Sequence, residues 1–113
     1  MSETRMSEEQ AIEINDTMLH GDQGEAVMAL RLAVMAFASA GNELSSLGES
    51  VPEDNPVAQA LMESWNKWME FLSRFTYAQQ CGEDWYGVIK EDVPWWEWLS
   101  DVYSHLDTLQ EVG

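Results

Sequence analysis

The sequence predicts an all-α protein: a small antiparallel bundle of three to four helices in a single domain of 113 residues. Apolar residues recur with the 3.6-residue period of an amphipathic helix over most of the chain. Proline or a capping residue stands where several of these segments begin. Hydrophobic residues make up 45% of the chain, enough for one core without disulfides or metal. Residues 1–6 are expected to be a flexible tail.

The first predicted helix runs from Ser7 to about Leu19. Ser7 followed three residues later by Gln10 is a capping-box pattern, in which each side chain accepts a bond from the other residue's backbone N–H. A narrow apolar edge is expected to face the core: Ala11, Ile12, Met18 and Leu19. The two glycines within residues 20–24 predict a turn after this helix.

The second predicted helix, from Glu25 to about Leu47, is apolar on nearly every side, which is typical of a buried helix. One stripe of this helix consists of small residues and another of bulky residues. The small stripe consists of Ala26, Ala29, Ala33, Ala36 and Ala40, and the bulky one of Val27, Leu30, Val34 and Phe37. We therefore predict a central helix with partners on both sides.

A second copy of the chain is one candidate partner for this helix, giving a homodimer. The contact would be made by four alanines: Ala29, Ala33, Ala36 and Ala40. Gly41 is expected to bend or fray the helix. The apolar run of residues 26–40 contains Arg31 and is too short and too polar for a predicted membrane span.

The third predicted helix, from Asn55 to Gln80, is expected to anchor the fold. Asn55 is an N-cap residue followed by proline at the first helical position, and Gly82 stands at the usual C-terminal position. Residues 48–54 form an acidic loop before it. The apolar arc is broad and consists of Val57, Ala60, Leu61, Met62, Trp65, Trp68, Met69, Phe71, Leu72 and Phe75.

The opposite face of the third helix is predicted to pair its own charges. Glu63 with Lys67 and Glu70 with Arg74 have the i,i+4 spacing of helical ion pairs. Because these charges would neutralise one another, we expect this helix to be scaffold and the binding surface to lie elsewhere.

Residues 83–92 are predicted as one helical turn with a loop, or as a short extended segment. The last predicted helix begins near Pro94, with Asp92 available as a cap, and continues towards the C-terminus. Trp65, Trp68 and Trp98 are expected to fill the core. Four further aromatic residues are expected to be difficult to bury together in so small a domain: Trp85, Tyr86, Trp95 and Trp96.

The net charge of −16 arises from 21 Asp and Glu against five Lys and Arg. It argues against direct binding to nucleic acid or an anionic membrane, because affinity for phosphates is carried by Lys and Arg. It favours a basic protein partner. Residues 1–23 carry six acids and one base, and residues 82–113 carry eight acids and one base, so the excess lies mainly at the two ends.

The acids of the last helix fall on one side and have no Lys or Arg of that helix to pair with. Trp96 and Tyr103 border them, and tryptophan and tyrosine are favoured at interface hot spots. Together with the acids just upstream they form the predicted partner-binding surface: Glu83, Asp84, Glu91, Asp92, Trp96, Glu97, Asp101, Tyr103, Asp107 and Glu111.

No catalytic, cofactor-binding or metal-binding motif is present in the sequence. His20, His105 and Cys81 lack the paired spacing of metal ligands, and a single cysteine cannot form an internal disulfide. A lone E-x-x-D pattern, Glu13 to Asp16, is expected by chance in so acidic a chain. The N-terminus lacks the features of a signal peptide, so a cytoplasmic protein is expected.

Three functional hypotheses follow. The first is a non-enzymatic inhibitor whose acidic rows occupy the phosphate sites of a basic nucleic-acid-binding protein, since acids at i,i+4 rise about 6 Å along a helix. By analogy, a phage or mobile element could encode such a protein. The second is a helical homo-oligomeric structural or chaperone-like adaptor whose charge maintains solubility. The third is a magnesium-dependent enzyme with an acidic site.

Overall fold

The computed structural model describes residues 5–47 and 54–112, and these confirm the all-α prediction. The described chain forms α1 (Glu8–His20), α2 (Gln23–Leu47), α3 (Pro56–Cys81), α4 (Trp85–Ile89) and α5 (Trp95–Val112). The short α4 settles residues 83–92 in favour of the helical turn. Residues 48–53 of the predicted acidic loop and residues 1–4 of the predicted tail lie outside the described residues.

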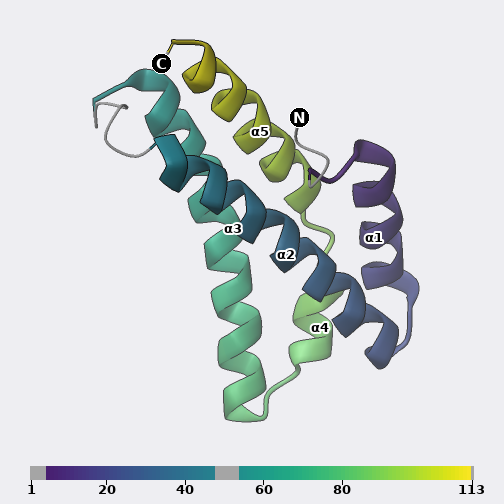
Figure 1. Ribbon diagram of the computed structural model, residues 1–113. Helices are drawn as coiled ribbons and strands as arrows, with labels where there is room; N and C mark the ends of the chain where they lie inside the picture. Colours follow the sequence, from purple (N-terminus) through teal and green to yellow (C-terminus); the bar gives the residue numbers. More distant parts are fainter. Residues whose placement is uncertain (1–4, 48–53, 113) are drawn as a thin grey trace.

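The five helices pack around one core (Figure 1). α1 and α2 form a hairpin, and α5 packs along α3. The short α4, which follows α3 in the chain, contacts both α3 and α2 near the C-terminal end of α3. α5 also contacts α2 and α1, so the C-terminal helix connects both halves of the chain. The bundle measures 43 × 28 × 19 Å, an elongated shape in which a helix can have one face without a neighbour.

The predicted helix ends are confirmed by their capping bonds. The Gln10 amide donates to Ser7 Oγ at 3.2 Å and the Ser7 amide donates to Gln10 Oε1 at 3.1 Å. Asn55 Oδ1 accepts from the Val57 amide at 2.8 Å, and Gly82 ends α3 in the left-handed conformation with φ 72°. The last helix starts near Pro94 as predicted: α5 begins at Trp95, directly after Pro94, and the Pro94 carbonyl accepts from its first turn.

A second capping box was missed at the start of α2. The Glu25 amide donates to Asp22 Oδ1 at 2.8 Å and the Asp22 amide donates to Glu25 Oε1 at 3.1 Å. The D-x-x-E spacing was visible in the sequence. It moves the start of the helix to Gln23, so the turn that was expected over residues 20–24 is only Gly21 and Asp22.

The centre of the core is an aromatic cluster. Trp68 of α3 stacks on Phe37 of α2, with ring centroids 4.1 Å apart and planes within 4°, and Trp95 of α5 lies 6.2 Å from Trp68. Of the four aromatic residues expected to be difficult to bury together, Trp95 is fully buried, and its indole Nε1 donates to Asn15 Oδ1 of α1 at 3.1 Å. This hydrogen bond satisfies the polar atom that makes a tryptophan costly to bury.

The other aromatic residues of the C-terminal segment are half-buried. Tyr86 reaches the α1–α2 turn, where its hydroxyl donates to the Gly21 carbonyl at 2.7 Å. Trp85 packs edge-on against Phe75 of α3, and Trp96 packs against the core. Most of the aromatic surface of the C-terminal segment is therefore used inside the fold.

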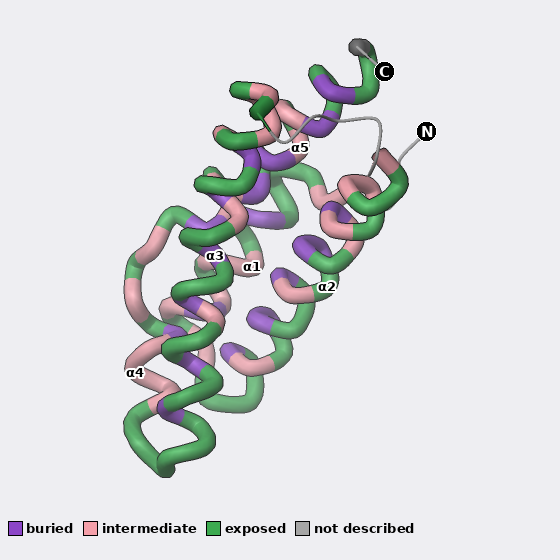
Figure 2. Tube along the Cα trace, turned by 90° about the vertical axis from the view of Figure 1, so that its left-hand side faces the viewer, coloured by how far each residue is buried: buried purple, intermediate pink, exposed green. Residues whose placement is uncertain are grey.

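One face of α2 is exposed, which corrects the prediction of a helix buried on all sides. Figure 2 shows buried positions on the side of α2 that faces the other helices and exposed positions on its outer side. The outer side carries Met28, Leu32 and Met35, which are 57%, 48% and 66% exposed. Apolar residues expected at the core on other helices are also exposed: Ile12, Met62 and Met69.

By length and composition alone, α2 could cross a membrane, as many helices in protein cores could. The prediction considered only residues 26–40, whereas the helix extends over residues 23–47. In the structure it carries Arg31 on its exposed side and buries Leu30 and Phe37 against the rest of the chain.

Two features expected of the long helices are absent. α2 does not fray at Gly41, because the helix continues to Leu47; Gly41 faces the Trp65 indole. The charge ladder on α3 is not formed, because the ion pairs among the described residues do not include Glu63–Lys67 or Glu70–Arg74. Arg74 reaches across to Glu91, 2.8 Å away, before α5.

Candidate functional site

The predicted partner-binding surface is divided by contacts with the rest of the chain. Asp84 caps α4, and its Oδ1 accepts from the Gly87 amide at 2.9 Å. Glu91 is paired with Arg74. Asp101 accepts a long hydrogen bond of 3.5 Å from Ser64 of α3. These three carboxylates therefore contribute to the fold, which reduces what they can offer a partner.

The segment before α1 contacts α5 at Tyr103 and Asp107. Arg5 Nη1 lies 2.8 Å from Asp107, and Arg5 Nη2 lies 2.7 Å from Glu43 of α2. The guanidinium also lies 4.9 Å from the centre of the Tyr103 ring, and the Met6 amide donates to the Tyr103 hydroxyl at 3.2 Å. α5 carries no Lys or Arg of its own. The cation comes from the other end of the chain, so residues 5 and 6 are anchored rather than flexible.

These contacts shift two pKa values. The hydrogen bond to Glu43 is the main cause that raises the pKa of Arg5 above its ordinary value, with Asp107 adding to it against the effect of burial. Burial raises the pKa of the Tyr103 hydroxyl, against the hydrogen bond from Met6 and the nearby Arg5. Both groups keep their usual neutral-pH form, so this corner is a fixed structural contact.

The exposed carboxylates of the predicted surface that make no ion pair lie before α4, between α4 and α5, and on α5. On the predicted surface, no ion pair with a described residue is made by Glu83, Asp92, Glu97 or Glu111. Glu8, Glu9 and Glu13 add exposed acids on α1, which contacts α5. Trp96 and Tyr103 are half-buried beside them.

The alanines predicted to mediate self-association lie in the interior. Ala29, Ala33, Ala36 and Ala40 are 0–6% exposed, because the small stripe of α2 faces the other helices of the same chain. Ala33 and Ala40, at 0% exposure, cannot contact a second copy in the folded bundle, so the predicted contact through all four alanines is not available.

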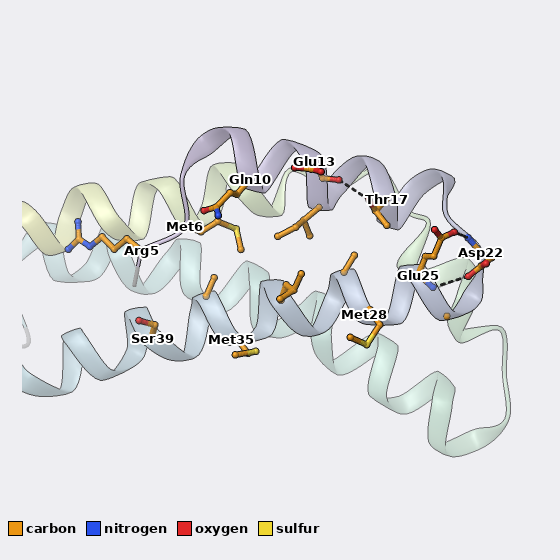
Figure 3. A pocket seen from close by; sticks show the side chains of 15 residues that line it. Arg5, Met6, Gln10, Glu13, Thr17, Asp22, Glu25, Met28, Met35 and Ser39 are labelled. Carbon is orange, nitrogen blue, oxygen red and sulfur yellow. Dashed lines mark hydrogen bonds between the residues drawn. The ribbon is translucent and has the colours of Figure 1, made fainter. Parts of the chain in front are cut away.

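A groove of about 1090 Å³ runs between α1 and α2, and sequence reasoning missed it (Figure 3). Its apolar lining is Ile14 from α1 and Met28, Ala29, Leu32, Met35 and Ala36 from α2. Acids stand on the α1 side and at the closed end of the hairpin: Glu13, Asp22 and Glu25. Arg5 and Met6 lie at the other end.

The sequence contained only part of the signal for this groove. Met28, Leu32 and Met35 have the i, i+4, i+7 spacing of one helical stripe. In a helix that is apolar all round, however, the pattern cannot tell which stripe lacks a neighbour, since that depends on where α1 and α3 pack.

Comparisons with protein-family models, with curated proteins and with solved structures all find no match. A function for this chain is therefore inferred from its own geometry and charge.

The described residues contain no group of three or more His, Cys, Asp or Glu side chains that could hold a metal ion. Cys81 is exposed at the end of α3, and His20 lies 3.7 Å from Asp16 on the surface of α1. The described surface offers carboxylates at high density and an apolar groove.

Proposed function

We propose that this chain is a non-enzymatic binding protein whose partner is a basic protein. The observation that carries the proposal is the set of exposed acids on α1 and α5 without a cation beside them, among them Glu97 and Glu111. Of the five Lys and Arg, Arg5 and Arg74 are engaged in ion pairs within the chain. Such a surface attracts a positively charged partner and accelerates its association.

A nucleic-acid-binding protein is the most specific class of partner that this surface supports. Its basic groove normally receives phosphates spaced along a strand, and exposed carboxylates along a rigid helix present charge in a comparable row. Glu97 and Glu111 are separated by about 21 Å along α5, from a rise of 1.5 Å per residue. The proposed activity is therefore competitive inhibition of nucleic-acid binding.

The experiment is affinity capture of basic proteins on the immobilised chain, followed by a binding assay with each purified captured protein. The variant Glu97→Lys/Glu111→Lys should weaken binding by about tenfold or more. The matched control, Glu63→Lys/Glu70→Lys on α3, changes the net charge equally at exposed positions and should weaken binding by only about twofold. Duplex DNA should compete with the chain for the captured protein.

Two results would contradict the proposal. Equal weakening by both variants would mean that only total charge matters and that α5 is not the site. A captured protein that binds DNA and this chain at the same time would exclude mimicry of nucleic acid.

A further inference from the structure

The α1–α2 groove presents an apolar stripe that no part of the described chain covers. Met28, Leu32 and Met35 expose about half or more of their surface along one line of α2. Large contiguous apolar patches on soluble proteins mark interaction sites, and methionine suits them because its flexible side chain adapts to a partner's shape. The stripe of Met28, Leu32 and Met35 is therefore an exposed apolar surface that neither the packing of the described helices nor the proposed acidic surface explains.

The dimensions of the groove fit one helix. The lining on α2 extends from Gly24 to Ser39, which is about 22 Å at 1.5 Å per residue. A helix of about fifteen residues, or four turns, covers that distance. An amphipathic helix binds such a groove by inserting residues at i, i+3, i+4 and i+7.

The charge at the rim defines the partner's polar face. Glu13 lies on the α1 side, and Asp22 and Glu25, whose carboxylates also form the capping box of α2, lie at the closed end of the hairpin. The cation among the lining residues is Arg5, whose guanidinium is already bonded to Glu43 and Asp107. Arg31 is exposed three residues after Met28, on the side of the stripe away from α1. A helix with Lys or Arg along the edge that faces α1 is complementary to this rim.

We infer that the α1–α2 groove binds an amphipathic, basic helix of a partner protein, with its apolar face on Met28, Leu32 and Met35. A second copy of this chain is the less favourable occupant, because two chains of net charge −16 would bring their acidic rims together. The inference rests on the proposed function in one respect, that the partner is basic, and it adds an apolar contact that charge alone does not require.

The test measures fluorescence anisotropy of a labelled synthetic peptide of about fifteen residues, built from leucine and lysine with leucine at helical spacing. Two further peptides are compared with it: one of the same composition with the helical period destroyed, and one in which glutamate replaces lysine. The protein variants are Met28→Gln/Met35→Gln in the groove and Met62→Gln/Met69→Gln on α3. Both pairs exchange two exposed methionines for an uncharged side chain of similar size.

The expected result is that the amphipathic lysine peptide binds best. The groove variant should weaken its binding by about tenfold, and the α3 variant should change it by less than about twofold. Circular dichroism of both variants should match the wild-type spectrum, which excludes loss of fold as the cause.

Each other outcome overturns the inference in a recognisable way. Equal binding of the period-destroyed peptide, or equal effects of both variants, would show that charge attraction alone accounts for peptide binding. The groove would then not be the binding site, whereas the proposed function would stand. Equal binding of the glutamate peptide would remove the requirement for a basic partner. If no cationic peptide binds at all, the proposed function fails as well. A dimer in sedimentation that the groove variant abolishes would make a second copy the occupant.

Discussion

Gly41 of α2 faces the Trp65 indole so closely that a β-carbon at position 41 would lie 3.0 Å from Trp65 Cη2. Trp65 also makes an edge contact with Phe37 of α2, with ring centroids 5.9 Å apart. The glycine therefore lets α2 and α3 approach each other around this ring, which is why it is accommodated within a long helix.

This contact predicts that Gly41→Ala changes the free energy of unfolding differently in the wild type and in a Trp65→Phe variant. In a Trp65→Phe background the alanine should raise the free energy of unfolding by up to about 1 kcal/mol, the usual gain in helix propensity. In the wild type the gain should be smaller or reversed, because the indole must move. Urea denaturation of the four proteins measures the coupling, and an equal effect of the alanine in both backgrounds would contradict the contact.

The bond from Trp95 Nε1 to Asn15 Oδ1 should be important for stability. Asn15→Ala leaves the N–H of a fully buried indole without an acceptor, which should lower the free energy of unfolding by about 1–3 kcal/mol. The control is Asn66→Ala, an exposed position on α3, with an expected effect within about 0.5 kcal/mol. Chemical denaturation compares them, and similar effects at both sites would rule out this role for the hydrogen bond.

Tyr103 should make the fold less stable at high pH. Because burial raises its pKa in the folded state above the unfolded value of about 10, the folded chain holds the phenolic proton more tightly than the unfolded chain. The stabilising contribution is complete below pH about 10 and is lost as pH rises through the folded pKa. The loss of unfolding free energy between pH 9 and 11 should therefore be smaller in Tyr103→Phe than in the wild type. Identical profiles of unfolding free energy against pH would contradict this role of Tyr103.

The methionines should separate into structural and surface classes. Met18 is 1% exposed, so Met18→Ala should cost about 2–5 kcal/mol of unfolding free energy. Met35 is 66% exposed, so Met35→Ala should change it by less than about 0.5 kcal/mol. Thermal denaturation compares the two, and a large loss at Met35 would mean that the stripe on α2 is covered by the chain itself.

Features that depend on neighbours in the sequence were predictable. Ser7 with Gln10, Asn55 before Pro56, and Gly82 after Cys81 fix helix ends through bonds that span at most five residues, and all were confirmed. The fold class followed from these ends and from the helical period.

Features that depend on distant residues were not predictable. Arg5 pairs with Glu43 and Asp107, which are 38 and 102 positions away, and this contact turns part of the predicted acidic surface into structure. Similarly, the side of α2 that lacks a neighbour is determined by the packing of α1 and α3. For this reason the apolar pattern of α2 alone did not indicate that Met28 and Met35 are exposed.

The most direct test of the account uses the methionine methyl groups as reporters. The chain labelled with ¹³C at its methionine methyls is titrated with the leucine–lysine helix peptide and followed by NMR. The groove carries Met6, Met28 and Met35, the exposed face of α3 carries Met62 and Met69, and the core carries Met18. We predict that the three groove signals shift with peptide concentration while those of Met62 and Met69 stay in place. Larger shifts at Met62 and Met69 than at Met28 and Met35, or no shift at any methionine, would contradict it.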